Sequence, residues 1–144
     1  MPDTPTDRPP PSIDQSLVDA YRSAHYTTNG FTLEIGEPHP EFDNWLSQRG
    51  LHKYCLITAH NPLSQPLPAI VNQARHRTLV QLLDRLKMNY TNASSNDPGG
   101  EWPAEPGVCL FDVAPARARE IGRLYQQNAI VEGRRGGVPE LYFL

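Results

Sequence analysis

Residues 54–64, YCLITAHNPLS, decide the fold of this chain, because an apolar run passes there directly into a polar loop. The apolar part shows no alternation with polar residues, which is typical of a strand covered on both faces of a sheet. A second apolar run, VCLFDV, occupies residues 108–113. We expect the two runs to form neighbouring central strands.

A long helix is predicted over residues 69–87, directly after the polar loop. Its inward stripe consists of four leucines, Leu79, Leu82, Leu83 and Leu86. At about 100° per residue the same stripe passes backwards through Asn72 and Arg75. A buried polar group without a partner costs about 1–3 kcal/mol, so we expect both side chains to meet the preceding loop.

Shorter elements complete the predicted domain. Further helices are predicted from Ser12 to the turn at residues 28–30, over residues 40–50 and from Pro115 to about residue 126. Helical spacing places Tyr21 of the first and Leu124 of the last toward the core. Further strands are predicted at residues 31–35, from residue 90, and as a terminal hairpin of residues 129–132 and 140–144. We therefore predict an α/β domain of the α+β type over residues 12–144, with a mixed sheet of five to six strands and about four helices packed on it in layers. Residues 1–11 contain five prolines and are predicted to be a disordered tail.

Composition argues against several classes of protein. The 144 residues carry a net charge of −3, which is not the basic surface of a nucleic-acid binder. The dipeptide Arg134-Arg135 is predicted to be a solvated hairpin tip. No apolar run is long enough for a membrane span and no secretory signal is visible, so a cytoplasmic location is expected. Cys55 and Cys109 lie in the two apolar runs and are predicted to be unpaired core thiols.

Signatures of cofactor and metal sites are not found. The sequence contains no glycine-rich phosphate loop and no Gly-x-Ser-x-Gly elbow. The five histidines show no pairing at metal-ligand spacing. We therefore predict neither a cofactor nor a metal ion.

The first candidate site lies where the loop meets the 69–87 helix. A small anion is predicted to be held there by Asn61, Ser64 and Arg75, with Thr58 and Asn72 beside them. Ligands in open α/β sheets gather at the carboxyl ends of strands, and a helix start offers free amides and arginine a bidentate fork. The alternative is a structural clasp, in which these groups satisfy the loop backbone.

Two further segments add candidates. Trp102 and Glu105 lie among prolines, where the tryptophan would wall a pocket and the glutamate would act as a general base or an acceptor. The alternative is a loop tryptophan covering the core with a solvated glutamate. Gln127, at a helix end, would contact the ligand or cap the helix. His60 is a weak catalytic candidate because of its near-neutral pKa.

These segments resemble a known bacterial family, domain of unknown function 3293. The resemblance rests on ITAHNPxS at 57–64, on Asn72-x-x-Arg75, on WxxEPG at 102–107 and on YQQNAI at 125–130. It covers about residues 17–144 and implies a compact stand-alone domain. The place of His60 varies in that family, which shifts weight from His60 to Thr58, Asn61, Asn72, Arg75 and Glu105.

Two classes of function follow from these patterns. The first is a domain that binds a small molecule or a nucleotide through an anionic group, with or without catalysis. The alternative is a non-catalytic regulatory or protein-interaction module that uses the N-terminal tail, the 91–106 loop and a sheet edge. Oligomeric state is not indicated by the sequence.

Overall fold

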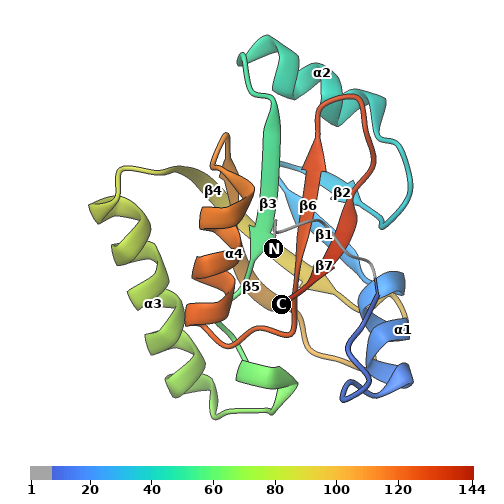
Figure 1. The fold of residues 1–144 in the computed structure, drawn as a ribbon, viewed down its shortest axis with the longest axis vertical. Helices are drawn as coiled ribbons and strands as arrows, with labels where there is room; N and C mark the ends of the chain where they lie inside the picture. The colour runs from blue at the N-terminus through green and yellow to red at the C-terminus, as the bar shows by residue number, and fades with distance from the viewer. Residues whose placement is uncertain (1–7) are drawn as a thin grey trace.

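One antiparallel sheet with helices on both faces makes up the computed structural model, which describes residues 8–144 (Figure 1). The strands are β1 (His25–Thr28), β2 (Phe31–Leu33), β3 (Lys53–Ile57), β4 (Asn89–Asn96), β5 (Glu105–Phe111), β6 (Ala129–Arg134) and β7 (Glu140–Phe143). The helices are α1 (Gln15–Ser23), α2 (Pro40–Gln48), the short 3-10 helix η1 (Pro62–Ser64), α3 (Ala69–Arg85) and α4 (Pro115–Leu124). Within the described residues the strand order is β2-β1-β4-β5-β3-β6-β7.

The prediction of a mixed sheet with five to six strands is wrong in two respects. The described residues form seven strands, and all six neighbouring pairs are antiparallel. Strand β1 was not expected, because Asn29-Gly30 was read as a helix end. These residues have φ values of 53° and 82° and form the two-residue turn between β1 and β2, the role that Asn-Gly takes in tight hairpins.

The predicted pairing of the two central apolar runs is confirmed. β3 and β5 are neighbours, with Cys55 opposite Leu110 and Leu56 opposite Cys109. They approach closely at Gly107, where a Cβ atom would lie 2.6 Å from the carbonyl oxygen of Ile57. Both cysteines are buried and free.

Each face of the sheet has its own core. Leu56 and Cys109 face α1 and α2, and the cluster there includes Val18 and Phe42. The opposite face packs against α3 and α4, with Leu79 and Leu83 fully buried as predicted. Burying one such side chain stabilises a fold by about 1.5–3 kcal/mol.

Two apolar side chains expected in the core are exposed instead. Leu86 is 38% and Leu124 is 65% exposed. Leu86 caps the end of α3, and Leu124 is the last residue of α4. Helical periodicity cannot show where the helix passes beyond the edge of the sheet, so the inward stripe was extended too far.

The N-terminal region is only partly described. Most of the predicted 1–11 tail lies outside the described residues, and its disorder stays a prediction. Helix α1 is capped by Asp14, whose carboxylate accepts a hydrogen bond from the Ser16 amide at 3.3 Å, rather than by Ser12. In the described part of the chain, no helix has the length and apolar character needed to cross a membrane.

Candidate functional site

The loop between β3 and α3 has an unusual backbone. Asn61, Leu63 and Ser64 all have positive φ, at 48°, 52° and 58°. Side chains other than glycine rarely adopt this region, and each such residue costs roughly 1–3 kcal/mol unless its surroundings stabilise it. The contacts that hold this loop therefore determine what it presents.

Asn72 holds the loop from the α3 side. Its Oδ1 accepts a hydrogen bond from the Asn61 amide at 2.9 Å, and its Nδ2 donates to Asn61 Oδ1 at 2.7 Å. The same Asn61 oxygen accepts from the Leu67 amide at 3.0 Å. Asn72 is only 6% exposed, so the predicted meeting of Asn72 with the loop is confirmed in the form of a clasp.

Arg75 is also bonded to backbone. Its Nε donates to the carbonyl of Ala59 at 2.7 Å, and its Nη2 donates to the carbonyl of Tyr125 at 2.6 Å. Arg75 therefore joins the end of β3 to the end of α4. Its predicted role toward an anion stays a prediction, but two of its nitrogen atoms already have partners.

On the other side of the loop lies a cavity of about 300 Å³, which we call the α1 cavity. It is enclosed by Leu17, Ala20 and Tyr21 on α1 and by Leu56, Val131 and Leu141 on the sheet. Its volume equals that of about ten water molecules in the liquid. Small-molecule sites are typically concave and mainly apolar with a few placed polar groups, and the α1 cavity has this character.

The α1 cavity brings together six of the nine residues predicted from the sequence. Those that line it are Thr58, Asn61, Ser64, Trp102, Glu105 and Gln127. Those that do not are His60, Asn72 and Arg75. The loop thus has two sides, with the clasp facing α3 and the cavity facing α1.

Three predicted residues form walls of the α1 cavity. Trp102 is 53% exposed and lies at its edge. Thr58 Oγ1 donates to the carbonyl of Pro106 at 2.8 Å. Gln127 Nε2 donates to the carbonyls of His60 and Tyr125, each at 3.1 Å, so its amide also ties the loop to the end of α4.

Hydroxyl groups join α1 to the loop. The Tyr21 hydroxyl is hydrogen-bonded to Ser64 Oγ. Asn128 Nδ2 donates to both, at 3.1 Å to Tyr21 and 3.2 Å to Ser64. The Tyr26 hydroxyl donates to the carbonyl of Tyr21 at 2.6 Å.

Sequence reasoning missed these tyrosines and Asn128. Tyr21 was read as a core residue at helical spacing, and Tyr26 lay just before the turn at Asn29-Gly30 that was read as a helix end rather than as a hairpin turn. Asn128 lies next to Gln127 in the segment YQQNAI, which was singled out from the sequence. Its place in that segment is the sequence feature that could have identified it as a site residue.

Glu105 supplies one of the two carboxylates that line the α1 cavity. The pairing of β1, β4 and β5 places Tyr26, Ser95 and Glu105 in one row across the sheet. Glu105 is half-buried, and among the described residues its carboxylate has no hydrogen bond or ion pair. Burial raises the pKa of Glu105 from its ordinary 4.5 to about 6. Burial also raises the pKa of Tyr26, and the charges of Tyr21 and Glu105 raise it further.

His60 lies outside this arrangement. Its ring meets the ring of His76 edge-on at 6.2 Å between centroids. Burial lowers the pKa of both histidines, and for His60 the charges of His76 and Arg75 add to it. The described residues contain no group of three or more histidine, cysteine or acidic side chains placed to hold a metal ion.

Comparison with known proteins identifies the family. A family model described as "Protein of unknown function (DUF3293)" matches residues 57–130. Comparisons with curated proteins and with solved structures gave no match. The matched segment contains all nine predicted residues but not α1, which forms one wall of the cavity. Since it spans just over half of the 144 residues, the chain belongs to the family Protein of unknown function (DUF3293).

Proposed function

We propose that this domain binds a small, mainly apolar molecule in the α1 cavity. The observation that carries the proposal is the cavity itself, whose apolar walls surround a carboxylate without a partner among the described residues. Partial burial of a carboxylate without a partner destabilises a fold, and carboxylates perturbed in this way cluster at functional sites. A ligand that binds Glu105 would give a functional reason for keeping it there.

The α1 cavity supports this proposal better than the start of α3 supports an anion site. Arg75, the cation that the anion site requires, is bonded to two backbone carbonyls instead. The clasp residues hold the loop in its left-handed conformation, which places Ser64 and Asn61 at the cavity. We therefore propose that Asn72 and Arg75 act on ligand binding through the loop.

Catalysis is an extension of the same proposal. With a pKa of about 6, Glu105 has the acid-base strength that proton transfer near neutral pH requires. If the bound molecule is also transformed, Glu105 is the residue we expect to move the proton.

The test uses a bulky substitution on α1 that would fill the α1 cavity. We would screen mainly apolar compounds of about ten non-hydrogen atoms by thermal shift against wild type and Ala20→Phe. The matched control is Ser16→Phe, which adds the same ring on an exposed turn of α1. A ligand at 100 times its Kd stabilises the fold by about 2.7 kcal/mol.

We expect at least one compound to stabilise wild type and Ser16→Phe but not Ala20→Phe. Equal stabilisation of all three proteins would show that binding occurs elsewhere. A screen without any stabilising compound would count against the proposed function.

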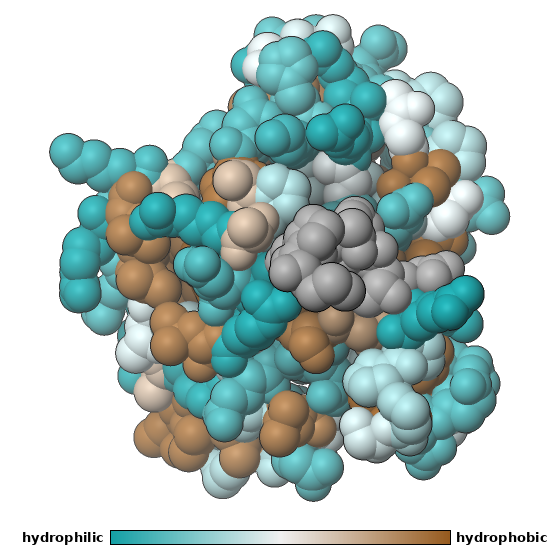
Figure 2. Space-filling model, viewed as in Figure 1, coloured by the Kyte–Doolittle hydropathy of each residue, from teal (hydrophilic) through white to brown (hydrophobic). Residues whose placement is uncertain are grey.

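A protein-interaction module is the second candidate, and exposed apolar side chains at one end of the molecule favour it. Leu63 is 54%, Ile70 73% and Leu124 65% exposed. The Leu63 amide donates to the carbonyl of Gln126 at 2.7 Å, which brings η1 next to the end of α4. Figure 2 shows hydrophobic surface gathered at the lower left, near the end of α3 that follows η1 in Figure 1.

An Ile70→Glu, Leu124→Glu variant tests this candidate. Pull-downs from lysate with wild type and variant, together with sedimentation of the purified proteins, would detect a partner or self-association. A partner lost in the variant supports the module. Identical results for both proteins would remove it.

We propose a cytoplasmic location, which the two unpaired cysteines support. Cys55 and Cys109 are both free, as expected in a reducing compartment. Localisation of a tagged full chain in cells by fractionation would test this.

A further inference from the structure

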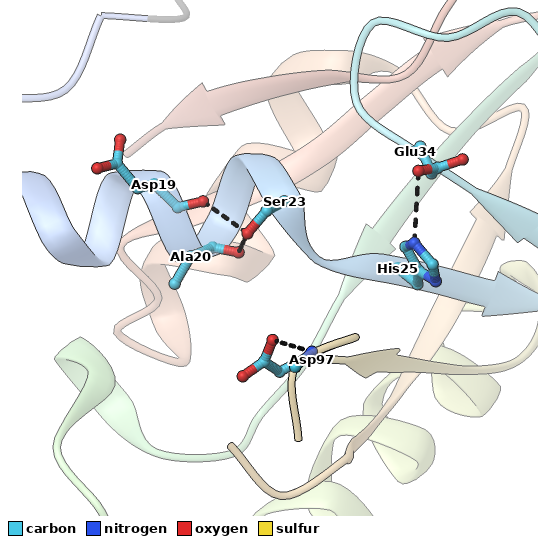
Figure 3. Close-up of polar contacts among 7 residues, drawn as sticks. Asp19, Ala20, Ser23, His25, Glu34 and Asp97 are labelled. Atoms are coloured by element: carbon cyan, nitrogen blue, oxygen red, sulfur yellow. Dashed lines mark hydrogen bonds and ion pairs between the residues drawn. The ribbon is translucent and has the colours of Figure 1, made fainter. Parts of the chain in front are cut away.

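The charged side chains that line the α1 cavity indicate which charge its ligand carries. Its described lining contains two carboxyl side chains, Asp97 and Glu105, and no lysine, arginine or histidine. His25, the first residue of β1, does not line the cavity and pairs with Glu34 at 3.4 Å (Figure 3). The fixed charges facing a ligand are therefore negative.

Asp97 is already engaged with its own turn. Its Oδ1 accepts a hydrogen bond from the Gly99 amide at 2.9 Å, and its Oδ2 accepts from the Glu101 amide at 2.8 Å. Figure 3 shows this carboxylate directed at the backbone that follows it. Glu105 is the remaining carboxylate for a ligand.

Several neighbouring polar groups already bond one another. The Tyr26 hydroxyl donates to the carbonyl of Tyr21, and the hydroxyls of Tyr21 and Ser64 bond each other. Asn128 donates to both of these hydroxyls. No hydrogen bond from a described residue reaches the Glu105 carboxylate, so a ligand that donates a hydrogen bond suits it, whereas an anionic ligand would place a like charge beside it.

We propose that the α1 cavity binds a small organic amine, with its protonated nitrogen paired to Glu105 and its apolar body against Leu17, Ala20 and Leu56. This inference rests on the proposed function, because it specifies the ligand of the same cavity. A charge-assisted hydrogen bond to a half-buried carboxylate is stronger than a neutral one. The volume of about 300 Å³ suits a primary amine that carries one aromatic ring.

The test compares three probes of nearly equal size. Isothermal titration calorimetry at pH 7.5 would measure 2-phenylethylamine, the neutral 2-phenylethanol and the anionic phenylacetate against wild type, Glu105→Gln and Ala20→Phe. We expect wild type to prefer the amine over the alcohol by about tenfold or more. Glu105→Gln should remove that preference and leave the affinity for the alcohol unchanged, and phenylacetate should bind weakest.

The same preference should depend on pH. The titratable side chains lining the cavity are Tyr21 on α1, Tyr26 on β1, Asp97 after β4 and Glu105 on β5. Burial raises the pKa of Glu105 to about 6, whereas a primary amine stays protonated from pH 5 to pH 8. Amine affinity should therefore rise about tenfold from pH 5 to pH 7.5 in wild type and stay flat in Glu105→Gln.

The outcomes separate this inference from the proposed function. Equal affinity for amine and alcohol, with no effect of Glu105→Gln but loss in Ala20→Phe, would overturn the amine inference and keep the cavity as a binding site. Preference for phenylacetate would also overturn it. Failure of all three probes would count against both, whereas loss of the amine preference in Glu105→Gln alone supports the inference.

Discussion

Replacing Glu105 by glutamine should stabilise the protein at neutral pH. Moving the pKa of a carboxyl from 4.5 to about 6 corresponds to about 2 kcal/mol of lost stability once it is ionised in both states. Part of the side chain contacts solvent, which reduces this value. We therefore expect Glu105→Gln to raise the free energy of unfolding by about 1 kcal/mol at pH 7.5.

The sign of the pH dependence follows from the raised pKa. Between pH 4.5 and about 6 the native protein binds more protons at Glu105 than the unfolded chain does, so wild type loses stability as the pH rises. Glutamine has no such titration. The advantage of the variant should therefore be small near pH 4.5, grow through pH 6 and become constant above about pH 7.

Urea unfolding of wild type and Glu105→Gln at several pH values from 4.5 to 7.5 measures this difference, and titrations common to both proteins cancel. Glu101→Gln is the matched control, because Glu101 is an exposed carboxyl four residues away. It should show no comparable trend. Two results would refute the reasoning. One is a Glu105→Gln variant that is less stable than wild type at pH 7.5, and the other is a difference in the free energy of unfolding that stays the same at every pH.

Three further variants test the packing around the site. Asn72→Ala should destabilise the fold by about 1–3 kcal/mol, since the Asn61 amide would lose its acceptor, and hydrogen exchange of the loop should quicken; unchanged exchange would contradict the clasp. Gly107→Ala should cost about 1–3 kcal/mol by thermal or urea unfolding, because its Cβ would meet the Ile57 carbonyl at 2.6 Å; a neutral effect would refute the close approach. Tyr21→Phe should cost about 1 kcal/mol by losing a shared hydroxyl, whereas unaltered stability would show that this bond contributes nothing.

The central strands could be predicted because their signal is local. The runs containing Cys55 and Cys109 are apolar without alternation, and they pair as expected. Strand β4, NYTNASSN, is polar and carries no comparable pattern. It is a strand because β1 and β5 flank it on both sides, which is a property of the whole sheet.

The site was predicted only in part, because local patterns in the sequence do not show how the whole sheet is arranged. Helical phase correctly brought Asn72 to the loop, but phase shows only which side a residue faces. The expected anion site borrowed the geometry of parallel sheets, whose ligands gather at one edge. In an antiparallel sheet that argument does not apply, and the cavity lies instead where α1 covers Glu105 and Tyr26.

The measurement that tests the central claim most directly is a carbon-13 NMR titration of the Glu105 carboxyl, with and without 2-phenylethylamine. The unliganded protein should titrate at Glu105 with a pKa of about 6. Saturating amine should lower that pKa, because a positive partner favours the ionised carboxylate. A carboxyl that titrates near 4.5, or one that does not respond to the amine, would contradict the account.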